Sequence, residues 1–227
     1  ESLGFFLRDL DKTLHARIEA YRLLWQTEDW QTFMLVFTGT DRLAHFLWDA
    51  YEDELHEHHE DFLEHFRQID AVIGEIVARL RDEDQLIMLS DHGFERLKSD
   101  VYVNRVLQDA GYLSFKEGAR PGLKSLDQEA KAFALDPGRI YLHAKDRYPN
   151  GSVEGDERTA LLAEIADLFG SLHYEGEPVI RRIYRKEELY GGDQASRAPE
   201  LVLLGNPGYN LRGNWRAKRI FGKDIFV

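Results

Sequence analysis

The chain has no cysteine and only two methionines among its 227 residues. The lack of cysteine excludes disulfide bonds and thiolate metal sites. It also suits a reducing compartment, so we expect the protein in the cytoplasm. No apolar run approaches the roughly 18 residues that a membrane-spanning helix needs, and no charged leader followed by an apolar stretch is present. We therefore expect neither a membrane segment nor secretion.

Positive charge is also scarce, because 29 lysines and arginines stand against 41 acidic residues, for a net charge of -12. Such a surface repels phosphate backbones, so a nucleic acid duplex is not an expected partner. The content of 43% hydrophobic and 31% charged residues is ordinary for a globular protein and unlike that of a disordered one. The length fits one large α/β domain with an insertion, or two small domains.

The first half of the chain alternates between helical and extended patterns. Apolar residues recur at helical spacing from Leu7 to Leu24, and again from Leu43 to Leu80 with an interruption in the acidic, histidine-rich segment 52–60. Two nearly continuous apolar runs, 32–37 and 85–90, predict strands buried on both faces. A strand, a long helix and a second strand make a right-handed crossover with parallel strands, and ligands bind beyond the carboxyl ends of such strands.

The second half has a less regular pattern. We expect a helix over 101–110, a loop-rich stretch over 114–138, a strand over 138–143, a helix over 157–169 and a strand over 179–184. Residues 98–197 would then form a small inserted cap. The buried strand predicted over 199–205 would rejoin the main sheet. The predicted fold class is α/β, with a mostly parallel sheet flanked by helices, a core of 1–97 and 198–227, and the cap between them.

Each of the two apolar runs is followed by an aspartate and a histidine. Asp41 and His45 are four residues apart, on one face of a helix. Asp91 and His92 stand in a turn that Gly93 relieves. Taken alone, Asp41 is more simply a helix N-cap and Asp91 a turn former. Taken together, the two pairs predict a two-metal site, since carboxylate and imidazole bind zinc or manganese and paired ions can hold a phosphoryl group.

The segments 37–46 and 89–94 resemble those of the type I phosphodiesterase/nucleotide pyrophosphatase family of the alkaline phosphatase superfamily, and segments 101–104, 138–141 and 198–201 add a weaker likeness. The resemblance implies an alkaline-phosphatase-like fold and two divalent metal ions, zinc first and manganese as the alternative. It implies Asp41 and His45 as ligands of one ion, and Asp91 and His92 as ligands of the other. The implied substrate is a small phosphorylated molecule, either a phosphodiester or a nucleotide pyrophosphate. Sulfatases, phosphoglycerate mutases and phosphotransferases share this metal frame, and fold analogy does not choose among them.

Three parts of the family pattern have no counterpart in the sequence: an early aspartate, a threonine or serine nucleophile, and a late histidine. Thr13 lies in a helical stretch, and His143 and His173 lie in the predicted cap. We therefore expect the carboxyl-terminal part of one alkaline-phosphatase-like domain over 1–227, inactive alone, with its nucleophile outside this chain. The alternative is a non-catalytic module of the same fold that binds metal or another ligand. The oligomeric state is not predicted.

Other clusters have simpler interpretations. His56, His58, His59 and His65 do not have metalloprotease spacing and are predicted to lie on a solvated helix or loop. The basic residues of 181–186 are predicted to form a charged rim, and 209–214 a polar surface loop.

Overall fold

The computed structural model describes residues 2–223, in two compact units that divide between Arg96 and Leu97. The first unit contains α1 (Ser2–Thr27), α2 (Gly39–Glu52) and α3 (His59–Val77). The second contains the strands β1 (Ser99–Tyr102), β2 (Ala132–Leu135), β3 (Arg139–Leu142), β4 (His173–Tyr174), β5 (Glu177–Pro178), β6 (Ile180–Arg185), β7 (Leu201–Gly205), β8 (Tyr209–Arg212) and β9 (Phe221–Gly222). Its helices are α4 (Val103–Asp109), α5 (Glu157–Gly170) and α6 (Lys186–Leu189), with short 3-10 turns η1 (Leu123–Ser125) and η2 (Ala195–Arg197).

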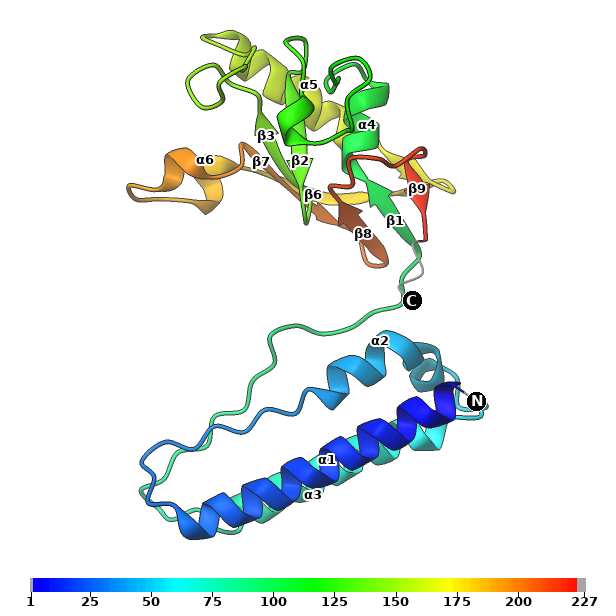
Figure 1. The fold of residues 1–227 in the computed structure, drawn as a ribbon, viewed down its shortest axis with the longest axis vertical. Helices are drawn as coiled ribbons and strands as arrows, with labels where there is room; N and C mark the ends of the chain where they lie inside the picture. Colours follow the sequence, from blue (N-terminus) through cyan, green and yellow to red (C-terminus); the bar gives the residue numbers. More distant parts are fainter. Residues whose placement is uncertain (1, 224–227) are drawn as a thin grey trace. The chain divides into compact units, whose positions relative to one another are not determined.

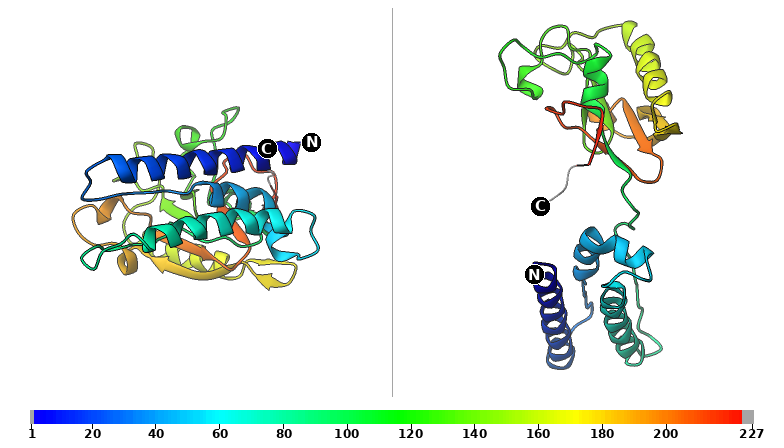
Figure 2. Two further views of the ribbon diagram at one scale, coloured as in Figure 1. Left: turned by 90° about the horizontal axis from the view of Figure 1, so that it is seen from below. Right: turned by 90° about the vertical axis from the view of Figure 1, so that its right-hand side faces the viewer.

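The helical periods predicted in the first half are confirmed. In the first unit α1 and α3 lie side by side, and α2 packs against α3 (Figures 1 and 2). One apolar cluster joins Leu10 of α1 to Leu43 of α2 and Phe62 of α3. A second joins Tyr21 of α1 to Val72 of α3. The break between α2 and α3 falls in the acidic segment, as its loss of apolar period indicates.

The two strands predicted in this unit are wrong. Segments 32–37 and 85–90 are extended, but neither forms a strand within residues 2–223. An extended segment becomes a strand only when a neighbour pairs with its backbone, and these two have no such ladder in the described structure. Phe33, Leu35 and Phe37 pack on the second helical cluster, whereas Met34 is 84% exposed and Leu89 is 84% exposed. The helix between them therefore does not complete a parallel crossover.

The second unit is built on two larger sheets and one short hairpin. A four-stranded antiparallel sheet has the order β2-β3-β7-β6. In the three-stranded sheet of order β8-β1-β9, β1 pairs parallel with β8 and antiparallel with β9. The sheets are thus antiparallel or mixed, and the expected mostly parallel sheet is wrong. The strand predicted over 199–205 does form, as β7, but it pairs antiparallel with β3 and β6.

The core of the second unit lies between α5 and the strands. α5 buries Leu161, Ile165 and Phe169 there, and β3 and β7 contribute Ile140 and Leu201. The predicted surface loop over 209–214 is wrong in its first four residues, because Tyr209–Arg212 is β8 and pairs residue by residue with β1. Residues 198–223 belong to this unit with the segment 97–197. Their grouping with 1–97 into one core stays a prediction.

Asn104 connects three parts of the second unit. This side chain at the start of α4 is only 2% exposed. Its amide nitrogen donates to the carbonyls of Ala134 (3.0 Å) and Gly213 (2.9 Å), and its oxygen accepts from the Ala134 backbone N–H (2.7 Å). Its polar atoms thus form hydrogen bonds with backbone groups of β2 and of the segment after β8. Without Asn104 these buried groups would lack a partner.

Candidate metal centre

The first Asp/His pair lies in the first two turns of α2. Asp41 and His45 are one turn apart, and His45 Nε2 lies 3.5 Å from Asp41 Oδ1. Asp41 stands in the first turn, where a carboxylate interacts favourably with the positive end of the helix dipole. The helix N-cap is Thr38, so Asp41 is not the cap. Both side chains face solvent, with 47% of Asp41 and 62% of His45 exposed.

The second pair follows the extended segment 85–90 and reaches the first pair through His92. His92 Nε2 lies 3.5 Å from Asp41 Oδ1 and 3.7 Å from Asp91 Oδ2. Asp91 also accepts the His92 backbone N–H at 3.1 Å, a local turn contact. The side chain of Asp91 is 88% exposed. The structure therefore brings the two motifs together, with Asp41 next to both imidazoles.

Phe94 packs against both imidazole rings. Its ring meets that of His45 edge to face at a centroid distance of 4.9 Å and that of His92 at 5.3 Å. It also stacks with Trp48 at 5.8 Å, and it packs against the cluster that joins α1, α2 and α3. Phe94 was assigned no role in the sequence analysis. Its position directly after Asp91, His92 and Gly93 was the one feature of the sequence that placed it near the pair.

The donor chemistry and the pairwise spacing of these residues fit a divalent ion. Two ligands at 2.0–2.2 Å from a tetrahedral ion lie roughly 3.3–3.6 Å apart. The 3.5 Å separations of Asp41 from His45 and from His92 fall in this range. Within residues 2–223, however, no group of three or more such side chains is arranged to hold an ion. The structure thus presents two close carboxylate–imidazole contacts that share Asp41, with Asp91 turned to solvent.

The chain was compared with models of known protein families. The model for type I phosphodiesterase / nucleotide pyrophosphatase matches residues 6–224. The chain belongs to this family. A comparison with curated proteins and one with solved structures each gave no match.

Membership in the type I phosphodiesterase/nucleotide pyrophosphatase family confirms the resemblance carried by segments 37–46 and 89–94. It makes the protein a member of a hydrolase family whose enzymes typically depend on metal ions. None of the helices described between residues 2 and 223 is long and apolar enough to cross a membrane.

Three other histidines in the first unit of this phosphodiesterase family member make contacts of their own. His58 Nδ1 is 2.9 Å from Asp61, and His59 Nδ1 is 2.7 Å from the Ala50 carbonyl. The first contact joins the α2–α3 connection to α3, and the second joins the start of α3 to α2. His65 is only 7% exposed, so its predicted place on a solvated surface is wrong. It sits on the inner face of α3 with Phe62 and Ile69, where helical spacing brings every third or fourth residue.

Proposed function

We propose that the protein is a metal-dependent hydrolase of phosphate esters, acting on a phosphodiester or a nucleotide pyrophosphate. The observation that carries this proposal is the 3.5 Å approach of His92 to Asp41, which joins the two motifs of a hydrolase family. A small phosphorylated molecule is the expected substrate. The cytoplasm stays the expected location, and the oligomeric state is left open.

The proposed ligands are Asp41 and His45 for one ion, and Asp91 and His92 for the other. Their carboxylate and imidazole donors favour zinc, with manganese as the alternative. Bound ions would supply positive charge to polarise a phosphoryl oxygen. In this chain, Asp41 would stand beside the metal-binding nitrogens of both imidazoles, and the ring of Phe94 would pack against both. The side chain of Asp91 is 88% exposed and lies 3.7 Å from His92, so it is free to change rotamer toward an ion that His92 binds.

The fold we propose for the intact enzyme is alkaline-phosphatase-like, with 1–97 and 198–227 as part of its core and 98–197 as a cap. The proposal also leaves the nucleophile outside this chain. The hydroxyl groups nearest the ligands in sequence are engaged with the backbone: Thr40 Oγ1 donates to the Phe37 carbonyl at 3.1 Å, and Ser90 Oγ donates to the His92 carbonyl at 2.5 Å. Neither hydroxyl is assigned an attacking role. The alternative is a non-catalytic module that binds metal without hydrolysis.

The test combines metal analysis with hydrolysis of an aryl phosphodiester, on the 227-residue chain and on the product of its full reading frame. We expect bound zinc or manganese, and hydrolysis by the full product that a chelator abolishes. Asp91→Ala should remove both properties, while Asp49→Ala, an exposed carboxylate on α2, should leave them unchanged. Metal-independent hydrolysis, or full activity in Asp91→Ala, would overturn the metal assignment. Metal binding without hydrolysis by the full product would favour the module.

A further inference from the structure

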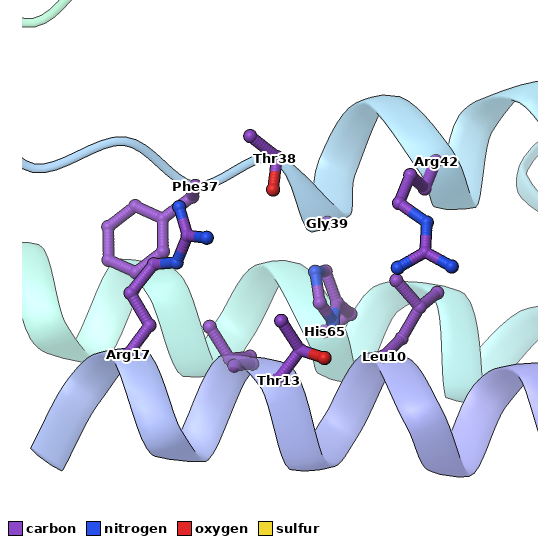
Figure 3. Close-up of a pocket in the computed structure, with 9 residues that line it drawn as sticks. Leu10, Thr13, Arg17, Phe37, Thr38, Gly39, Arg42 and His65 are labelled. Carbon is purple, nitrogen blue, oxygen red and sulfur yellow. The ribbon is translucent and has the colours of Figure 1, made fainter.

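A small hollow lies in the first unit where α1 passes the start of α2 (Figure 3). Arg17 and Thr13 of α1, Gly39 and Arg42 of α2, and His65 of α3 are among the residues around it. Its volume of about 10 Å³ gives room for the centre of one oxygen-sized atom. The residues proposed to bind metal, Asp41 and His45, do not line it.

His65 brings a buried polar atom to this hollow. The residue is 7% exposed, and its Nε2 has no hydrogen-bond partner among the residues that the structure describes. A Cβ placed on Gly39 would lie 2.5 Å from this nitrogen, so the ring sits directly against the start of α2. Burial lowers the pKa of His65, against a smaller opposing effect of Asp11. The imidazole is therefore neutral at physiological pH and can donate one N–H, and leaving a buried donor without an acceptor costs free energy.

The start of α2 adds a second set of donors. This helix has 14 residues, and the Thr38 side chain makes no capping hydrogen bond to it. The first N–H groups of a helix have no partner within the helix, and they carry the positive end of its dipole. Because Gly39 has no side chain, the His65 ring packs directly against the start of α2, and both border the hollow. Such a helix start favours an anion.

Two arginines flank the hollow from different helices (Figure 3). Arg17 donates from one Nη to the Val36 carbonyl. Arg42 lies with its Nη2 3.6 Å from Asp9 Oδ2 and its guanidinium 5.7 Å from the centre of the Phe6 ring. A guanidinium has five N–H donors, so each arginine keeps donors beyond these contacts. Two fixed guanidinium groups at an uncapped helix start match the charge and the donor demand of a phosphate group.

We propose that this hollow is a phosphate-binding site, distinct from the metal ligands, in which one phosphate oxygen accepts from His65 Nε2 and the start of α2. The remaining oxygens lie outside the hollow and accept from Arg17 and Arg42. Since only one oxygen enters, the phosphorus can carry a substituent that points to solvent. The site accordingly takes either inorganic phosphate or the phosphate group of a larger molecule.

The experiment measures binding of inorganic phosphate and of phenylphosphonate to the full chain in the presence of a chelator, by calorimetry and by the side-chain NMR signals of His65. We expect saturable binding that shifts these signals. Arg17→Gln combined with Arg42→Gln should weaken it at least about tenfold, as loss of charge-assisted hydrogen bonds does. Arg67→Gln, which removes the same charge from an exposed position on α3, should change it less than about twofold.

Binding of both probes supports a site for a substituted phosphate, and binding of inorganic phosphate alone supports a site for the free ion. Three outcomes would overturn the proposal: no saturable binding, equal affinity in the double arginine variant, or the same response to chloride at equal ionic strength. Both arginines are surface residues, so the variants should fold, and circular dichroism checks this. Because metal is absent throughout, the result is independent of whether the protein hydrolyses phosphate esters.

Discussion

His92 Nε2 lies 3.5 Å from Asp41 Oδ1, so the carboxylate of one motif stands between the imidazoles of both. This contact brings together two residues, Asp41 and His92, that α2 and α3 separate in the sequence. It makes Asp41 the residue on which the geometry of the proposed centre depends most. The aromatic ring of Phe94 reinforces the arrangement from the side of the helical core.

The first prediction concerns Asp41. Asp41→Asn should lower zinc affinity by more than the roughly 10–100-fold typical of outer-shell partners, because the proposed ligand beside His45 and His92 loses its charge. Competition with a chromogenic chelator measures the change. Asp49→Asn on the same helix is the control and should retain the affinity of the parent chain. Equal affinity in both variants would remove Asp41 from the ligand set.

The second prediction concerns the contact between Gly39 and His65. Gly39→Ala should lower the free energy of unfolding of the first unit by about 1–3 kcal/mol, because the new methyl group would overlap the imidazole. His65→Ala makes room for that methyl group. The double variant should therefore be more stable than additivity predicts, by about 1 kcal/mol. Urea denaturation of the parent, the two single variants and the double variant measures this coupling. Changes in the free energy of unfolding that simply add would contradict the contact.

The third prediction concerns Asp84, which follows α3. The Arg81 side chain and backbone donate to its carboxylate, and they lower its pKa from 3.8 to about 2. Because the folded-state pKa lies below the unfolded value, this pair stabilises the fold above about pH 4, and the contribution is lost as the pH falls toward 2. A carboxyl NMR titration should give a midpoint of about 2. Arg81→Gln should raise the midpoint, whereas Arg67→Gln should not move it.

The fourth prediction concerns Asn104. Asn104→Ala should destabilise the second unit by about 2–4 kcal/mol, since buried backbone groups of Ala134 and Gly213 lose their partners. Asn150→Ala, at an exposed position, should change stability by less than about 0.5 kcal/mol. Chemical denaturation followed by circular dichroism measures both. A loss below about 1 kcal/mol for Asn104→Ala would show that water replaces the amide.

The helices of the first unit and the contact within the first Asp/His pair could be predicted from local pattern. The apolar period from Leu7 to Leu24 depends only on the helix itself, and it gives α1. The spacing of Asp41 and His45 depends only on one helical turn, and it gives their 3.5 Å contact. The two pairs also lie together, each after an extended segment, although the expected parallel strands did not form.

The sheet topology and the packing of the helices depend on contacts between distant parts of the chain. The local sequence pattern carries no information about these contacts. Segment 32–37 has the composition of a strand, but it has no ladder partner in the described residues. Tyr209–Arg212 has polar positions typical of a loop, yet it pairs with Ser99–Tyr102. The place of His65 against Gly39 likewise depends on how α2 packs on α3. These contacts are set by packing and not by the intrinsic preference of each segment.

Segment 85–90 has a consequence for handling the protein. Ile87, Met88 and Leu89 form an exposed, uncharged window with high strand propensity, the kind of sequence that assembles into cross-β fibrils. Asp91 flanks it on one side with an exposed carboxylate that acts as a gatekeeper, since like charges keep such windows of different copies apart. Asp84 on the other side is paired with Arg81. The protein should therefore be stored at low ionic strength, where the repulsion between Asp91 side chains of different copies is least screened.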